Sequence, residues 1–386
     1  MAFLASVADG VGNVATYTLA FLFVLTVVVF VHELGHFLVA RWCGVAVKAF
    51  SIGFGREVWG FYDSHGTRWR LGWIPLGGYV KFMDDENAAS VPSRDAIGRM
   101  TAAERAGSFH AKPVWQRAAV VAAGPIANFL LAVAIFACMF MLIGVRTTAA
   151  KIDEVVADMP AATAGFKPGD VILKIDGHEV EGFNDVLRIV GTSPDRQLVF
   201  GVDRDGRYIE IPVTPALKEQ KDSFGSVHRR GMIGIKPVLT PETLEVKPVG
   251  PIEALRLGVK ETRFIITSTL SYIGDVLIGR QMADQLGGPI RIAQVSGQMA
   301  QLGPEFVAQL IAIISVSVGL INLFPIPLLD GGHLLFYALE AVRRRPLSER
   351  TQEIGFRIGF AVVLMLMVFA FYNDRGILAG WFSWPG

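Results

Sequence analysis

Four long apolar segments, separated by polar loops, dominate the pattern of the chain. Segments 16–40, 118–145, 306–329 and 354–373 are each close to the roughly 20 apolar residues that a helix needs to cross a bilayer core. The second has no charged residue, and the fourth has one, Arg357, near its start. Apolar runs of this length indicate membrane spans more strongly than four buried helices of a soluble core. We therefore predict a mainly α membrane protein with four transmembrane helices.

Basic residues are distributed unevenly among the loops, and this predicts an orientation. Residues 1–40 contain no Lys or Arg, whereas residues 41–117 contain eleven and residues 331–357 contain five. Cytoplasmic loops beside membrane spans are enriched in basic residues. We therefore predict that these two basic loops are cytoplasmic and that both termini lie outside. The long loop 146–305 is then extracytoplasmic, because loops of this length translocate largely regardless of their charge.

The loop 146–305 divides into a folded module and a helical segment. Strand-like stretches at 151–156, 171–175, 197–202 and 208–213 accompany Asp-Gly turns and a short helix at 184–190. This pattern predicts a compact α/β domain within 146–240. Residues 241–305 are predicted to form a linker and, over 251–279, an amphipathic helix at the membrane interface. The membrane core then consists of 1–145 and 306–386.

Composition agrees with a membrane protein and argues against other classes. Of 386 residues, 52% are hydrophobic and 18% charged, and the mean hydropathy is +0.44; typical globular chains carry about 25% charged residues. A formal net charge of +1 gives no reason to expect a nucleic-acid partner. Two cysteines cannot form a disulfide framework or a cysteine-type zinc finger. The first residues lack a basic n-region, so we expect no removable signal peptide.

The first apolar segment contains the motif His32-Glu33-Leu34-Gly35-His36. On a helix, His32 and His36 lie one turn apart on the same face and can bind one metal ion. Glu33 is placed to accept a proton from a metal-bound water without being a ligand itself. Ionisable groups inside a span are costly and usually functional. The motif therefore favours a hydrolytic zinc site over three polar groups that only contact neighbouring helices.

Catalytic zinc usually has three protein ligands, so two histidines leave the site incomplete. The best third candidate is Asp330, at the end of the third segment, where Pro325 and Pro327 interrupt the helix. Irregular backbone at membrane depth is tolerated where it is buried in protein or lines a cavity. The alternative for Asp330 is a helix N-cap. Loop or surface positions are expected for the remaining histidines: His65, His110, His178, His228 and His333.

These residues resemble a known family. The supporting motifs are HELGH at 32–36, Asn322-x-x-Pro-x-Pro-x-x-Asp330-Gly-Gly, Gly53-Phe-Gly55, Pro75-Leu-Gly-Gly-Tyr-Val-Lys81, Ala123-Gly-Pro-Ile-Ala-Asn128 and Gly287-Gly-Pro-Ile290. Together with a module between the second and third spans, they resemble the site-2 protease family. The nearest type is the bacterial RseP-type intramembrane zinc metalloprotease, here with a single PDZ domain rather than two.

The resemblance implies a role for each site residue. One zinc ion per chain is expected to be bound by His32, His36 and Asp330, with Glu33 as the catalytic base. Asn322 is expected to hold the unwound substrate backbone or to stabilise the tetrahedral intermediate, because an amide donor can stabilise oxyanion charge. The alternative for Asn322 is a hydrogen bond to a carbonyl freed by the nearby prolines.

The region 49–82 is expected to form a membrane-associated β region on the cytoplasmic side. Strand-like stretches at 58–62 and 68–73 flank a turn at Gly66. The resemblance implies a β sheet that dips into the membrane, and an open edge could pair with an unwound substrate helix. The expected substrate-binding residues are Gly53, Gly55, Gly78, Tyr79 and Val80. An ordinary cytoplasmic hairpin is the alternative.

The module at 146–240 resembles a PDZ domain through the stretch 160–177. A strand from Gly231 to Ile235 is expected to close its fold and, with the helix at 184–190, to form a peptide groove lined by Met232, Ile233, Gly234 and Ile235. The groove is expected either to bind a C-terminus exposed by an earlier cut or to exclude bulky ectodomains as a gate. The sequence does not decide between these roles.

The whole pattern predicts an intramembrane zinc endopeptidase of the bacterial inner membrane, with its active site toward the cytoplasmic side. Its expected partners are membrane lipid and single-pass transmembrane proteins already cut by another protease, such as an anti-sigma factor or signal-peptide remnants. The alternative is a zinc-binding scaffold that acts only through its PDZ domain. The presence of Glu33 argues against this alternative, because zinc binding alone does not need a base. A metal transporter is disfavoured because the polar groups cluster at one depth.

Overall fold

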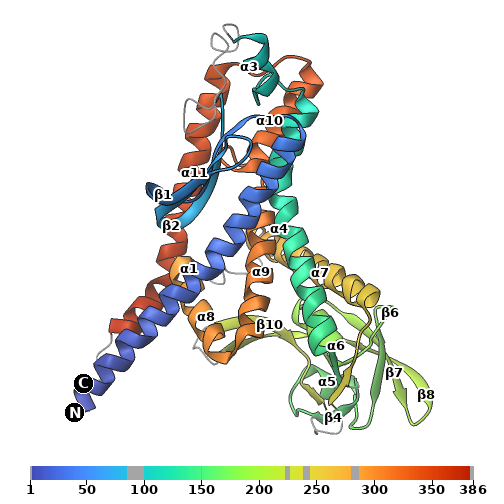
Figure 1. Cartoon of the computed structure of the whole chain (residues 1–386). Helices are drawn as coiled ribbons and strands as arrows, with labels where there is room; N and C mark the ends of the chain where they lie inside the picture. The colour runs from blue at the N-terminus through green and yellow to red at the C-terminus, as the bar shows by residue number, and fades with distance from the viewer. Residues whose placement is uncertain are drawn as a thin grey trace. The chain divides into compact units, whose positions relative to one another are not determined.

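We describe the protein from a computed structural model (Figure 1), which defines residues 2–84, 100–148, 150–221, 227–237, 244–279 and 287–382. The chain divides into two compact units. The first comprises Met1–Ala137 and Leu255–Gly386, and the second comprises Cys138–Ala254. Each unit is described separately below.

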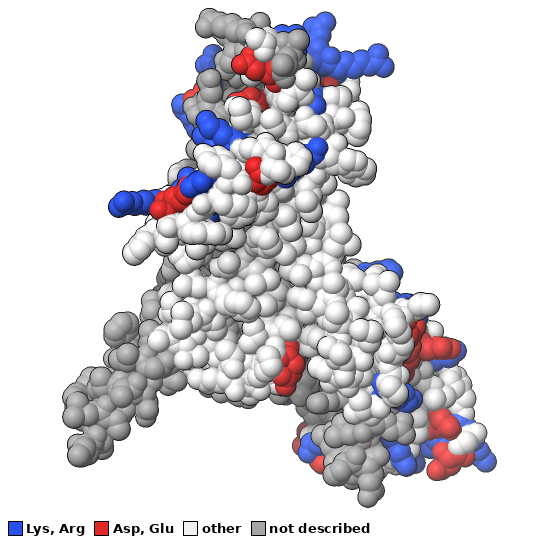
Figure 2. All heavy atoms as spheres, viewed as in Figure 1, with Lys and Arg blue, Asp and Glu red and all other residues white. Residues whose placement is uncertain are grey.

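Four helices of the first unit are long and apolar enough to cross a membrane, as predicted. They are α1 (Ala2–Trp42), α4 (Val114–Ile143), α9 (Pro304–Asn322) and α11 (Glu349–Phe382). On the face in Figure 2, charged side chains gather near α3 (Ala102–Gly107) and the hairpin of β1 (Val47–Tyr62) and β2 (Arg68–Phe82), and the helices below are largely uncharged. Helix α9 ends at Asn322, seven residues before the predicted end at 329, because Pro325 and Pro327 lack the backbone N–H that would continue it.

Close packing around α1 organises the first unit. A side-chain carbon added to Gly35 would lie 2.7 Å from Cβ of Ala127, so α1 and α4 approach closely at this point. Val24 and Val28 of α1 are buried against Leu310 and Ile311 of α9. The absence of a side chain at a helix crossing allows such approach in membrane proteins.

Two further helices of the first unit lie outside the candidate spans and before α9 in the chain, and the sequence pattern anticipated only one of them. The predicted amphipathic helix is α7 (Pro251–Leu277), which is not among the candidate membrane spans of the described residues. The unpredicted helix is α8 (Pro289–Leu302), which packs against α1, α9 and α11. Buried Asp374 of α11 accepts hydrogen bonds from the backbone N–H groups of Gly288, Ile290 and Arg291, at 2.9, 3.0 and 3.2 Å. A carboxylate thus caps the N-terminus of α8.

Strands β1 (Val47–Tyr62) and β2 (Arg68–Phe82) form a hairpin that folds back on itself. Residues 49–52 pair with 78–81 on one side and with 68–71 on the other, and 59–62 also pair with 68–71. Gly53 and Gly55 have φ values of +81° and +84°, which glycine adopts readily, and they bend β1 between its two halves. The hairpin therefore has two edges within the described residues: 57–62 and 78–82.

The second unit is an α/β module, as predicted. Its four-stranded sheet has the order β6 (His178–Glu179), β5 (Val171–Ile175), β7 (Leu198–Arg204) and β8 (Arg207–Val213). Three strand pairs surround it: β3 (Val145–Thr148) with β12 (Leu244–Lys247), β4 (Ile152–Val155) with β11 (Ile235–Pro237), and β9 (Ala216–Lys221) with β10 (Val227–Met232). Helices α5 (Pro160–Ala164) and α6 (Phe183–Gly191) complete the unit.

The prediction of a single closing strand over residues 231–235 is wrong. The chain forms β10 up to Met232 and β11 from Ile235, and these strands pair with different partners. The break falls at Gly234, whose φ is +82°, a value that interrupts an extended strand. The core of the unit is built from the buried faces of the sheet and α6, including Phe200 and Val186.

Candidate metal centre

The two motif histidines project from one face of α1. The ring centroids of His32 and His36 are 4.8 Å apart with an interplanar angle of 83°, and their Nε2 atoms are 3.2 Å apart. His32 is 8% exposed. The helical spacing of four residues brings the two Nε2 atoms close enough to bind the same metal ion.

Asp330 reaches the same point from the other half of the chain. It is the first residue of α10 (Asp330–Arg343), and its Oδ2 atom lies 3.1 Å from Nε2 of His32 and 3.5 Å from Nε2 of His36. The turn that precedes it is tight, because a side-chain carbon at Gly332 would lie 2.6 Å from Cα of Pro327. The sequence Pro-Ile-Pro-Leu-Leu-Asp-Gly-Gly thus ends one helix and starts the next with the carboxylate facing α1.

The arrangement fits a zinc ion. Ligand atoms of His32, His36 and Asp330 all lie within 4.8 Å of one another. Among the described residues, Asp330 Oδ2 is buried yet accepts no hydrogen bond of good geometry. Such a group is costly in a protein interior unless something compensates its charge. Two imidazoles and one carboxylate are a common ligand set of catalytic zinc, with a fourth position left for water or substrate.

Helix α4 contacts both histidine rings, and the sequence analysis did not predict these contacts. Nδ1 of His36 is 2.8 Å from the carbonyl oxygen of Val120, so this nitrogen donates a hydrogen bond, and in the neutral ring Nε2 keeps its lone pair. A carbon added to Gly124 would lie 2.5 Å from Cε1 of His36 and 2.9 Å from Cε1 of His32. Buried Asn128 has its side-chain amide 3.2 Å from Nδ1 of His32. The available signal was the motif at 123–128, which the sequence analysis used only as a family signature.

A cavity of about 340 Å³ opens beside the three candidate ligands. Several other predicted site residues line it together with His32, His36 and Asp330: Glu33, Gly78, Tyr79, Val80 and Asn322. Asn322 is the last residue of α9, and Gly78 is near Glu33, since a carbon added to Gly78 would lie 3.1 Å from Cγ of Glu33. The hairpin edge 78–82 therefore borders the cavity.

Three predicted positions differ from the other site residues. Gly53 and Gly55 bend β1 and are not among the described residues that line this cavity, and their expected contact with substrate stays a prediction. His333, expected on a loop or surface, lies in α10 and lines the cavity. Its ring is 5.4 Å from that of Phe356. Helical spacing from Asp330 places His333 one turn into α10, a helix that the sequence analysis considered only in the alternative in which Asp330 is an N-cap.

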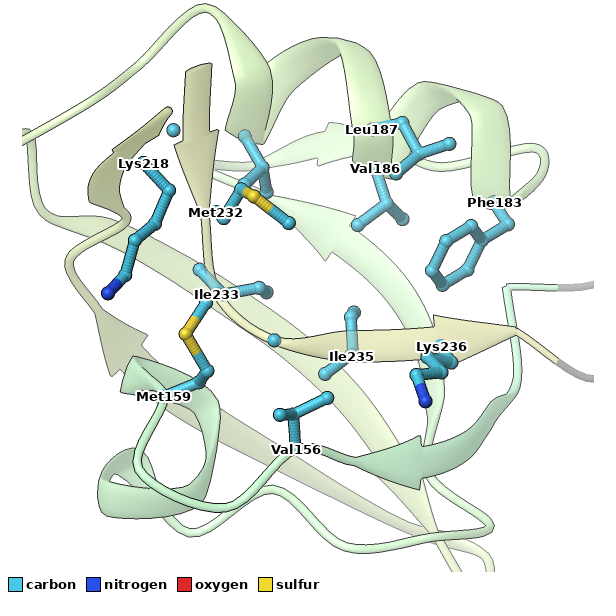
Figure 3. Close-up of a pocket in the computed structure, with 13 residues that line it drawn as sticks. Val156, Met159, Phe183, Val186, Leu187, Lys218, Met232, Ile233, Ile235 and Lys236 are labelled. Carbon is cyan, nitrogen blue, oxygen red and sulfur yellow. The ribbon is translucent and has the colours of Figure 1, made fainter. Parts of the chain in front are cut away.

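A second cavity, of about 440 Å³, lies in the second unit. Figure 3 shows Phe183, Val186 and Leu187 of α6 facing the segment that carries Met232, Ile233 and Ile235. The predicted groove residues, Gly234 included, thus line one cavity with α6. The lining is mostly apolar, with Lys218 and Lys236 at its margin.

A buried ion pair stabilises the second unit away from this groove. Asp170 is 1% exposed, and Nε and Nη2 of Arg204 donate to its two oxygens at 2.7 and 2.8 Å. Burial opposes the charge of Asp170, but the hydrogen bonds from Arg204 and from the backbone N–H of Lys167 outweigh it. They hold the pKa of Asp170 below its usual value.

Comparison with known proteins identifies the class of enzyme. The chain is 50% identical over 369 residues (96% of this chain, 98% of the relative) to a protein of Agrobacterium fabrum whose name assigns it to the zinc metalloproteases. It is 30% identical over 452 aligned positions (92% and 97%) to the regulator of sigma-E protease RseP of Salmonella typhimurium. Among solved structures, the PDZ domain of an SdrC-like protein from Listeria innocua is 18% identical, with a TM-score of 0.20, and the match covers 24% of this chain and 96% of that domain.

Residues 20–366 match the profile of peptidase family M50, and the chain belongs to this family. The expected resemblance to site-2 proteases is thereby confirmed. The protein is a multi-pass membrane zinc metalloendopeptidase.

Proposed function

We propose that the protein cleaves transmembrane segments of single-pass membrane proteins within the bilayer. The observation that carries this proposal is the position of the metal centre. His32, Glu33 and His36 lie inside the candidate span Ala15–Trp42, and the cavity beside them is bordered by a strand edge. A protease whose catalytic groups lie within a membrane span is suited to substrates that lie in the membrane.

His32, His36 and Asp330 hold the zinc ion in this proposal. Zinc, when bound, acts as a Lewis acid and makes water nucleophilic near neutral pH. Glu33 follows His32 in sequence and lines the same cavity, so its carboxylate accepts the proton of the attacking water. Asn322, at the cavity wall, offers amide N–H groups to the oxygen of the reacting carbonyl.

The free edge 78–82 supports a route for the substrate. A peptide bond inside a helix is shielded by the helix, so the substrate must unwind before cleavage. Among the described strands, residues 78–81 pair only with 49–52, so their other side is open to an extended peptide as an added strand. Tyr79 and Val80 lie at this edge and line the cavity beside Glu33.

The hairpin also presents a surface suited to a membrane interface. Trp59, Tyr62 and Trp73 are 63%, 68% and 75% exposed. Trp and Tyr are enriched where a membrane meets water. Together with the basic loops 41–117 and 331–357, this supports an inner-membrane location with the hairpin on the cytoplasmic side and both termini outside.

The test of the catalytic role is Glu33→Gln in the full chain, reconstituted in lipid with a single-pass model substrate that lacks an ectodomain. We expect loss of cleavage with one zinc per chain retained, because the amide cannot accept the proton but does not disturb the ligands. Glu305→Gln, on an exposed carboxylate at the start of α9, is the matched control and keeps both. Normal cleavage by Glu33→Gln would refute the mechanism. Zinc retained without cleavage by the wild type would favour the scaffold alternative.

The groove of the second unit supports a role in substrate choice, either as a binding site for an exposed C-terminus or as a gate. Leu187 lines the groove and is 58% exposed, so Leu187→Asp changes the groove with little cost to the core. If the groove binds peptides, this variant loses cleavage of substrates with a free C-terminal tail. If the unit is only a gate, cleavage of those substrates is unchanged. Cleavage of the model helix without an ectodomain is expected in both cases.

A further inference from the structure

Asn128 is a fully buried polar residue in the middle of a span, and its side chain contacts a metal ligand. Its exposed fraction is 0%, and Nδ2 lies 3.2 Å from Nδ1 of His32. Its Oδ1 is buried and has no hydrogen-bond partner among the described residues. A polar group buried without full pairing in an apolar helix is costly, so its position needs a reason.

The tautomer that His32 needs in order to bind a metal ion supplies that reason. Nε2 of His32 faces Asp330 and His36, so it is the nitrogen available to a metal ion. Binding through Nε2 requires a lone pair there, and the neutral ring then carries its proton on Nδ1. An N–H at Nδ1 needs an acceptor, and an amide NH2 group is not one. A half-turn of the Asn128 amide exchanges its nitrogen and oxygen in nearly the same positions, and Oδ1 then receives this proton.

The neighbouring ligand is held in an equivalent way. Nδ1 of His36 donates to the carbonyl of Val120 at 2.8 Å. Val120, Gly124 and Asn128 are spaced by four residues, so they form one stripe along α4. Val120 holds His36, Gly124 leaves room for both rings, and Asn128 contacts His32.

We propose that Asn128 is the positioning residue of His32. Its Oδ1 accepts the Nδ1–H of the imidazole, which fixes the ring orientation and directs the Nε2 lone pair toward zinc. The inference rests on the proposed zinc ligands. The backbone of Asn128 is itself anchored, because Ser315 Oγ of α9 donates to its carbonyl at 2.9 Å. Groups that hydrogen-bond to metal-bound histidines typically contribute 10–100-fold to metal affinity.

The test compares zinc affinity in Asn128→Leu and Asn128→Asp, measured by competition with a chelator in the detergent-purified full chain. We expect about 10–100-fold weaker binding for Asn128→Leu, which offers no acceptor. For Asn128→Asp we expect near wild-type affinity, because a carboxylate oxygen also accepts the Nδ1–H. Ser296→Ala is the matched control, since it removes a hydrogen bond of an equally buried side chain in α8 without touching Asn128 or His32. Thermal unfolding of the metal-free proteins shows whether each variant is folded.

Each outcome decides a separate point. Wild-type affinity in a folded Asn128→Leu would overturn the proposal, and so would equal losses in the Leu and Asp variants, since these indicate packing alone. If Asn128→Leu does not fold, the Asp variant decides by keeping or losing zinc. His36→Ala is measured in parallel. If it keeps zinc, the proposed ligands are wrong; if it loses zinc while Asn128→Leu keeps it, only the role of Asn128 is wrong.

Discussion

Gly124→Ala tests whether the space between α1 and α4 is reserved for the histidine rings. The added methyl carbon would lie 2.5 Å from Cε1 of His36 and 2.9 Å from Cε1 of His32. Carbon atoms normally approach to about 3.5–4.0 Å, so the ring of His36 must retreat by roughly 1 Å. Zinc sites tolerate ligand distances within only about 0.2 Å. The variant is therefore expected to lose His36 as a ligand.

The size of the effect follows from the share of one ligand in zinc binding. Apparent binding free energies of about 10–16 kcal/mol for four ligands assign roughly 2.5–4 kcal/mol to each. At about 1.4 kcal/mol for each factor of ten, zinc affinity is expected to fall by about 10²–10³-fold. The global fold is expected to lose only about 1–3 kcal/mol from overpacking.

The assay is zinc content after equilibration against chelators of graded strength, with thermal unfolding of the same samples. The matched control is Gly258→Ala, which adds the same methyl group where α7 approaches α4. Its carbon would lie 2.7 Å from the carbonyl oxygen of Val133 and 3.4 Å from Cβ of Ala137, a comparable overlap that involves no histidine. The control should keep wild-type zinc affinity. Unchanged zinc affinity in Gly124→Ala would refute the claim that this space is needed by His36.

Three further predictions concern stability. Asp374→Ala leaves three N–H groups at the start of α8 without an acceptor and should destabilise the protein by about 2–4 kcal/mol, measured as a lower melting temperature in detergent. Glu340→Gln breaks a two-point contact with Arg117 that joins α10 to α4 at 2.7 and 3.2 Å; about 1–3 kcal/mol should be lost, and an unchanged urea midpoint would contradict this. The pKa of Asp170 is lower in the folded protein than the value of about 3.9 expected in the unfolded chain, so the ionised carboxylate stabilises the second unit above that pH. This stabilisation is lost as the pH falls from about 3.9 toward the folded-state pKa. Arg204→Met should therefore lower stability at pH 7 and flatten its fall below pH 4 in circular-dichroism melts.

Local sequence predicted those parts of the protein that depend on local interactions. Long apolar runs indicated the four spans, and in the second unit the strand 171–175 was predicted with the bounds it has in the structure. The turns at Asp176 and Asp205 were also expected, and both residues have positive φ. In each case the periodicity or the turn residues are sufficient because the neighbours in sequence are also neighbours in space.

The parts that sequence did not predict depend on which distant segments meet. The motif at 123–128 marks this part of α4, but it does not predict that Gly124 faces His36, because this depends on the crossing of two helices. The helix at 289–302 is short and contains polar residues, and it is held in part by Asp374 from the far end of the chain. The division of 231–235 into two strands likewise follows from their different partners rather than from their composition.

The separation of the ligands along the chain has a consequence for biosynthesis. His32 and His36 precede Asp330 by nearly 300 residues, and the whole second unit is encoded between them. At synthesis rates of about 5–20 residues per second, the histidines are made roughly 15–60 s before the carboxylate. During that interval the nascent chain contains the proposed base and two of the three proposed ligands. If all three ligands are needed, cleavage can begin only after the second unit has been made and the third span has emerged.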